Sequence, residues 1–151
     1  VLGRGYDACI LMGTDVPEVR AEYLERAFGL LEQKDVVLGP TRDGGYYLVG
    51  MKKPRRAVFE VEGYGQGSVL WDTVRRIKTE GCTVGFTEAM WDMDVYQDLQ
   101  GYRRRMREDK RLHNTSTGRY LAKTSRISII VLHPYNRLEC YLPFLLRQSK
   151  R

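Results

Sequence analysis

The sequence has few of the residues that mark several common classes of protein. Its 151 residues include only three cysteines and two histidines. Cys9, Cys82 and Cys140 lie far apart and match no zinc or redox spacing, so we expect free thiols and a cytoplasmic protein. His113 and His133 have no serine or cysteine partner at a recognisable spacing, which gives no indication of a nucleophilic triad.

Long apolar runs are also absent. No stretch approaches the ~18 consecutive apolar residues that a membrane-spanning helix needs, so we expect no membrane span. The first residues include neither an initiator methionine nor the charged and apolar regions of a signal peptide. We therefore expect the chain to begin inside a larger protein.

The composition is that of a globular domain, with 42% apolar and 29% charged residues. The net charge is +6, and a basic run lies at residues 101–111. Such a run can bind nucleic acid, but it is more often the solvated face of a helix. Because no nucleic-acid motif accompanies it, we do not expect a nucleic-acid partner.

Apolar runs and helical periodicities alternate along the chain. Residues 8–12, 35–40, 45–51 and 82–86 resemble strands, and the first of these is expected to be buried on both faces of a sheet. Helices are predicted over residues 16–34, from Ser68 to Gly81, and after Asp94, with Pro17 in the first turn of the first helix. This alternation predicts an α/β three-layer sandwich with a mostly parallel sheet.

Three segments follow from this pattern. Residues 1–111 are expected to form one α/β domain, and residues 112–125 a linker. Residues 126–151 restart the pattern with a predicted strand and helix.

Carboxylates follow three of the predicted strands. Asp15, Asp43 and the pair Asp92 and Asp94 each lie just beyond a strand, where open α/β sheets bind their ligands. Oxygen ligands of this kind suit a hard divalent cation that also contacts a substrate diphosphate. For Asp15 and Asp94 the alternative is a helix N-cap.

The sequence also resembles a known family through three motifs in the same order: "LMGTDVP", "DVVLGPTRDGGYYLVGM" and "WDMDVYQDL". They are similar to those of bacterial GT-A-like transferases known as radical-SAM/selenodomain-associated transferase 1, relatives of nucleotide-diphospho-sugar transferases. The resemblance covers about residues 7 to 105. It implies a Rossmann-like GT-A fold, a Mg²⁺ or Mn²⁺ ion, and transfer of a glycosyl or nucleotidyl group from a nucleotide-sugar or nucleotide donor. The acceptor and any homo-oligomer remain open.

Carried over to this sequence, the resemblance implies roles for four acidic residues. Asp15 and Asp94 would be metal ligands, and Asp43 and Asp92 would be catalytic carboxylates.

The same resemblance implies a donor pocket lined by Gly44, Gly45 and Tyr46.

The sequence departs from the family pattern at two places. Val95 replaces a threonine, which weakens the cap of the following helix. The N-terminal glycine-containing loop that would hold the nucleotide has no counterpart, so we expect a fold that is incomplete at its N-terminus.

Residues 126–151 are similar over a short stretch to the opening strand of family-2 glycosyltransferases. They would start a second transferase domain, or residues 127–132 would pair with the first sheet within the chain or across a dimer. A non-catalytic interaction or oligomerisation module, left by truncation of a transferase, is the alternative function.

Overall fold

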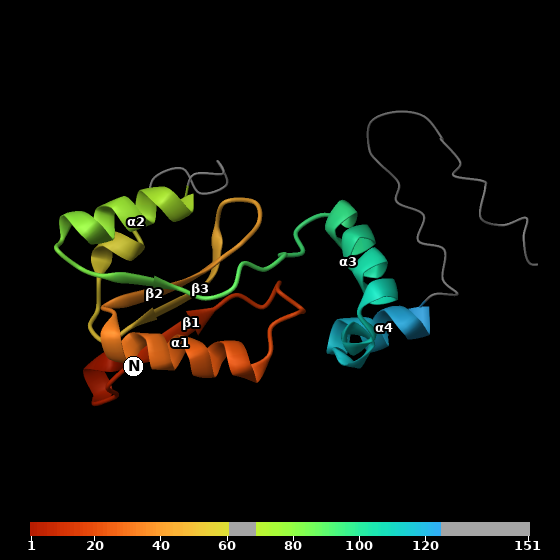
Figure 1. The fold of residues 1–151 in the computed structure, drawn as a ribbon, viewed down its shortest axis with the longest axis horizontal. Helices are drawn as coiled ribbons and strands as arrows, with labels where there is room; N and C mark the ends of the chain where they lie inside the picture. The colour runs from red at the N-terminus through yellow and green to blue at the C-terminus, as the bar shows by residue number, and fades with distance from the viewer. Residues whose placement is uncertain (61–68, 125–151) are drawn as a thin grey trace, which may run out of the picture.

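The computed structural model describes residues 1–60 and 69–124, which form two lobes (Figure 1). Residues 1–60 and 69–91 make up the sheet lobe, and residues 96–124 make up the helical lobe. The strand and helix predicted for residues 126–151 lie outside the described residues. The elements in chain order are η1 Leu2–Arg4, β1 Cys9–Met12, α1 Ala21–Gln33, β2 Val36–Pro40, β3 Tyr46–Met51, η2 Arg56–Val58, α2 Val69–Thr79, β4 Val84–Phe86, α3 Tyr96–Glu108, η3 Lys110–Asn114 and α4 Ser116–Thr124.

The sheet is mixed, with the strand order β1-β3-β2-β4. Strand β3 pairs antiparallel with both β1 and β2, whereas β4 pairs parallel with β2. The predicted mostly parallel sheet is therefore not confirmed. The reason is the short connection over residues 41–45, because a parallel crossover needs about a dozen residues or more and a hairpin does not.

Strand β2 contributes to the core on both faces of the sheet, because its successive buried side chains point to opposite faces. Helix α2 covers one face and α1 covers the other, which gives three layers (Figure 1). The cluster on the α2 side contains Val36, Leu38, Val49, Met51, Val58, Leu70, Val74, Ile77 and Cys82. The cluster on the α1 side contains Val16, Ala27, Leu31, Val37, Tyr47, Leu48 and Met90.

Strand β1 differs from its prediction. It is the outermost strand next to β3, and Leu11 and Met12 are 60% and 40% exposed. The predicted burial on both faces is wrong here because β3 is the one strand paired with β1 in the described sheet. Apolar composition alone does not separate an edge strand from a central one.

The helix boundaries agree with the pattern at one end of α2 and differ at the start of α1. Gly81 follows α2 with a φ of 73°, a left-handed conformation that ends the helix as expected. Helix α1 begins at Ala21, so Pro17 lies in a preceding turn instead of in the first helical turn. None of the described helices combines the length and the apolar character needed to cross a membrane.

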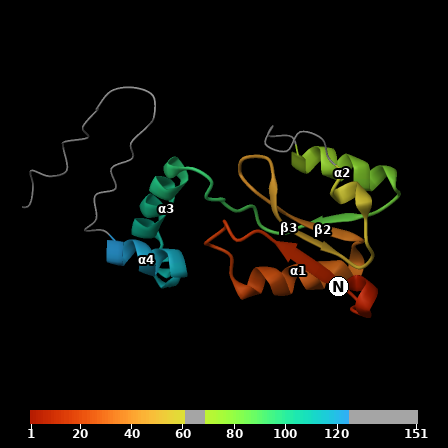
Figure 2. The same ribbon diagram turned by 180° about the vertical axis from the view of Figure 1, so that it is seen from behind.

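The helical lobe has a small core of its own, formed by Tyr102, Met106, Leu112 and Leu121. The stretch predicted as a linker, residues 112–125, contains the end of η3 and, up to residue 124, all of α4, and Leu112 and Leu121 belong to this core. The Tyr102 hydroxyl donates to the Leu112 carbonyl oxygen at 3.1 Å, which fixes η3 against α3. In both views α3 and α4 lie beyond one end of the sheet, not over either face (Figure 1 and Figure 2).

Alanine substitutions at two helical glycines should change the stability of the protein in opposite directions. A Cβ at Gly118 would lie 2.0 Å from the Leu112 carbonyl oxygen, whereas a Cβ at Gly29 in α1 would meet nothing within 4 Å. We expect Gly118→Ala to lower the free energy of unfolding by about 2 kcal/mol or more, because backbone must move. Gly29→Ala should raise it by ~0.5–1 kcal/mol through helix propensity. Urea denaturation followed by circular dichroism measures both, and equal effects would contradict the described packing.

Candidate functional site

Three strands bring acidic side chains to one end of the sheet. Strands β1 and β2 both run antiparallel to β3, and β4 runs parallel to β2, so β1, β2 and β4 point the same way. Asp15, Asp43 and Asp92 follow their C-terminal ends. The predicted convergence of the carboxylate turns at one rim therefore follows from the sheet, although the sheet is mixed.

The pairing of β2 with β4 continues past the named strands. Thr41 forms an isolated parallel bridge with Met90. The Met90 N–H donates to the Pro40 carbonyl at 2.9 Å, and the Arg42 N–H donates to the Met90 carbonyl at 3.0 Å. This extension fixes the register of the two loops that bear the carboxylates.

Asp43 and Asp92 each lie two residues beyond the Thr41–Met90 bridge, and they form a cluster with Asp94. One carboxylate oxygen from each of the three residues lies within 4.8 Å of the other two. Asp43 and Asp94 are exposed, and Asp92 is half-buried. We call these three residues the acidic cluster.

Asp43 is held in place by its own turn. Its Oδ1 accepts hydrogen bonds from the Thr41 hydroxyl at 2.5 Å and from the Gly45 N–H at 3.0 Å. Gly44 has a φ of 98°, and a Cβ at Gly45 would lie 2.9 Å from the Thr41 Oγ1. Gly44 and Gly45, which were predicted to line a donor pocket, thus allow the turn that orients Asp43.

Tyr46 points away from the acidic cluster. Its hydroxyl donates to the Val58 carbonyl at 2.9 Å, and its ring packs against the core on the α2 side. Tyr47 is buried on the α1 side, with its hydroxyl 3.1 Å from the Thr87 Oγ1. The structure therefore uses the side chain of Tyr46 in the scaffold, although its neighbours Gly44 and Gly45 belong to the turn that orients Asp43.

Asp15 is not used as a helix cap, because the N-cap residue of α1 is Arg20. Its Oδ1 lies only 2.5 Å from where a Cβ on Gly13 would be, so the side chain folds back over the end of β1. Asp15 is not a member of the acidic cluster, but its charge contributes to raising the pKa of Asp92. It is an outer carboxylate of the same rim.

Asp94 is likewise not the cap of its helix. The N-cap residue of α3 is Val95, and the Asp98 carboxylate accepts from the N–H groups of Asp94 and Val95 at 3.0 and 2.9 Å. Capping is thus provided by a residue inside the first turn, because Val95 has no side-chain acceptor. The carboxylate of Asp94 makes no hydrogen bond or ion pair with the part of the chain that the structure describes.

The cluster shifts the acidity of its members in opposite directions. The Thr41 hydroxyl, more than any other group, lowers the pKa of Asp43. Partial burial raises the pKa of Asp92, and the charge of Asp43 raises it further, followed by smaller contributions from Asp94 and Asp15. As the pH falls, Asp92 therefore takes up a proton before Asp43 does.

This donor set fits a hard divalent cation. Three carboxylates from two loops offer oxygen ligands at mutual distances compatible with one ion, and no hydrogen-bonded cation neutralises them within the described residues. The mutual repulsion expressed in the pKa of Asp92 is the repulsion that such an ion would relieve.

A half-buried ion pair ties the helical lobe to the rim. The Glu18 Oε1 accepts from the Nη2 and Nε of Arg105 at 2.6 and 2.7 Å. The guanidinium of Arg105 also lies 5.2 Å from the ring centre of Trp91. Arg105 in α3 thus connects the loop after Asp15 to the loop that carries Asp92.

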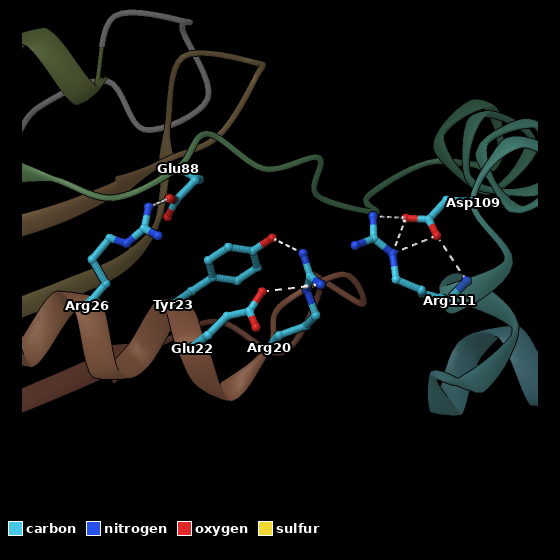
Figure 3. A network of polar contacts seen from close by, with 7 residues as sticks. All are labelled: Arg20, Glu22, Tyr23, Arg26, Glu88, Asp109 and Arg111. Atoms are coloured by element: carbon cyan, nitrogen blue, oxygen red, sulfur yellow. Dashed lines mark hydrogen bonds and ion pairs between the residues drawn. The ribbon is translucent and has the colours of Figure 1, made fainter.

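Other polar pairs near this junction stay within one lobe, as Figure 3 shows. Arg20 at the start of α1 bonds to Tyr23 at 2.5 Å and pairs with Glu22 at 3.2 Å. On the facing side Arg111 makes paired bonds to Asp109, which lowers the pKa of that carboxyl to about 2. Among the described residues of Figure 3, no ion pair joins these two groups.

A hollow of about 310 Å³ lies at the opposite end of β2. It is lined by Asp35, Lys52, Lys53 and Arg55. The Asp35 Oδ2 accepts from the N–H and hydroxyl of Thr83 at 2.8 and 2.7 Å, so this carboxylate serves the scaffold. The hollow contains none of the residues predicted for catalysis or metal binding.

Comparison with known proteins supports a transferase-like fold. Residues 1–66 match DUF2064, a family described as "Uncharacterized protein conserved in bacteria". The chain is also similar to the crystal structure of a protein from Desulfovibrio desulfuricans G20 that is proposed to be a nucleotide-diphospho-sugar transferase. The identity is 29% and the TM-score is 0.73, over 82% of this chain and 54% of that one. The chain thus spans about half the length of that structure. No curated protein matches the chain.

The raised pKa of Asp92 predicts a cost in stability when no metal is bound. A carboxyl with a pKa higher in the folded state than in the unfolded state loses stability as the pH rises through that interval. Without divalent cations, Asp92→Asn should therefore melt at a higher temperature than the wild type at pH 7. The gain should vanish at a pH below the ordinary range of aspartate, where both side chains are neutral.

Differential scanning fluorimetry over a pH series in chelator measures this difference. Asp7→Asn, a change at an exposed position outside the rim, is the matched control and should show no such gain. A lower melting temperature of Asp92→Asn at pH 7 would contradict the described electrostatics.

Proposed function

We propose that this chain contributes the acidic rim of a transferase that uses a nucleoside-diphosphate-type donor with a divalent cation. The group transferred would be a glycosyl or nucleotidyl group. The observation that carries the proposal is the meeting of Asp43, Asp92 and Asp94 at the C-terminal rim of the sheet, in a register set by backbone pairing. Ligands of open α/β sheets bind at this rim. The similarity to a proposed nucleotide-diphospho-sugar transferase supports the same class of substrate.

The acidic cluster would hold Mg²⁺ or Mn²⁺. Asp94, predicted as a ligand, lies within reach of Asp43 and Asp92, so these two would share the ion instead of acting apart from it. Asp15 would remain an outer carboxylate. When bound, such an ion offsets the negative charge that develops on a diphosphate leaving group.

The residues of the chain prepare this site in two ways. Thr41 and Gly45 hold the Asp43 carboxylate in one orientation and in its ionised form. Asp92, whose pKa is raised, would release its proton when a cation enters, so cation binding should weaken as the pH falls. Gly44 and Gly45 would shape the floor of the site through their backbone.

A calorimetric titration tests this proposal. UDP and GDP should bind the wild type with Mg²⁺ or Mn²⁺ and lose affinity by roughly 10-fold or more in chelator. Asp94→Asn, which removes a charge but fills the same volume, should have the same effect as the chelator. Asp7→Asn should bind as the wild type does.

Binding that survives both the chelator and Asp94→Asn would contradict the metal role. An absence of binding to either nucleotide in the wild type would favour the non-catalytic interaction or oligomerisation module.

A further inference from the structure

Arg42 and Trp91 lie together at the edge of the acidic cluster. The guanidinium carbon of Arg42 lies 5.5 Å from the centre of the Trp91 ring. Arg42 directly precedes Asp43, and Trp91 directly precedes Asp92. The N–H of Arg42 donates to the carbonyl of Met90, so the same backbone pairing that positions the carboxylates also positions this contact.

Arg42 differs from the other arginines near the rim. Arg105 is engaged by Glu18 at 2.6 Å, and Arg26 pairs with Glu88. Arg42 is exposed and makes no ion pair with any residue of the described ranges, although Asp43 is its neighbour in the chain. Of these three guanidinium groups it is the one whose hydrogen-bond donors remain available to a ligand.

The rim is negatively charged, so a guanidinium group that is free to bind a phosphate matters there. The acidic cluster and Asp15 present four carboxylates, which repel a phosphate group that approaches them. A cation beside the cluster would offset part of this repulsion. The planar fork of an arginine donates two parallel hydrogen bonds to phosphate oxygens, and stacking on an indole ring limits its orientations.

We propose that Arg42, laid against Trp91, is a phosphate-binding residue of this rim. This inference rests on the proposed function and names a further contact of the same site. Arg42 would receive either a phosphate of the donor diphosphate or a phosphate carried by the acceptor. Trp91, which is 45% exposed, would hold the guanidinium in place and leave it open to the ligand.

Trp91 itself provides the readout. In a Trp71→Phe background it is the single tryptophan of the chain, since the sequence has two. We would titrate this protein in Mg²⁺ with UDP and with glycerol 3-phosphate, using uridine and glycerol as neutral controls. A phosphate that binds the guanidinium held against the indole should change the Trp91 emission in a saturable way, and the neutral controls should not.

Variants assign the response to Arg42. Arg42→Gln should raise the half-saturating concentration at least 10-fold, and Arg42→Lys should raise it less, because lysine keeps the charge but not the fork. Arg75→Gln removes an exposed arginine of α2 that pairs with Asp72 at 2.9 Å, and it should leave the titration unchanged. A response to UDP alone would assign the donor phosphate, and a response to glycerol 3-phosphate would assign a phosphorylated acceptor.

The inference is overturned if neither phosphate compound changes the emission, or if Arg42→Gln responds as its parent does. Calorimetry separates this outcome from a failure of the proposed function. In one outcome, Arg42→Gln binds UDP with metal and with the affinity of its parent, and the Trp91 emission does not change. This result would support the metal site and contradict the role of Arg42. In the other outcome, glycerol 3-phosphate changes the Trp91 emission in a way that depends on Arg42, but UDP does not bind with metal. This result would support the phosphate site and contradict the proposed nucleotide donor.

Discussion

The parallel pairing of β2 with β4, and its continuation through the bridge between Thr41 and Met90, is the constraint on which the site depends. It joins two segments that lie about a third of the chain apart in sequence. Backbone hydrogen bonds to Met90 set the register of both loops. Because Asp43 and Asp92 are equally far beyond the bridge, a change of register would separate their carboxylates.

Contacts around the rim stabilise its loops, whereas the repulsion between its own carboxylates opposes folding. Partial burial and three neighbouring carboxylates raise the pKa of Asp92, so its ionised form at neutral pH is unfavourable unless a cation offsets the charge. The hydrogen bonds to Asp43, the cap that Asp98 provides for α3, and the ion pair of Glu18 with Arg105 hold the surrounding loops in place. Sites that bind ligands often retain such local strain, because the ligand relieves it.

The sequence predicted the three layers and the position of the acidic residues for a physical reason. Apolar runs that end in Gly, Pro and Asp mark strand ends, and strand ends in α/β sheets meet at one rim. The predicted mostly parallel sheet was not confirmed, because β3 runs antiparallel to both of its neighbours, and the short loop over residues 41–45 was the available signal for a hairpin. The edge position of β1 had no local signal, because pairing partners far along the chain decide it.

Side-chain roles were harder to predict than backbone positions. Tyr46 resembled a pocket residue, but a β-bulge between Gly39 and Pro40 and the hydroxyl bond to Val58 place its half-buried ring against the core on the α2 side. The contact of Arg42 with Trp91 was also missed, since nothing local links residues so far apart until the register of the two loops is known.

Metal binding by the acidic cluster can be tested directly by anomalous diffraction from a crystal soaked in Mn²⁺ and measured at the manganese absorption edge. We expect one strong anomalous peak surrounded by carboxylate oxygens of Asp43, Asp92 and Asp94. A crystal whose only manganese peaks lie away from this cluster, with the three carboxylates in place and accessible to solvent, would contradict it.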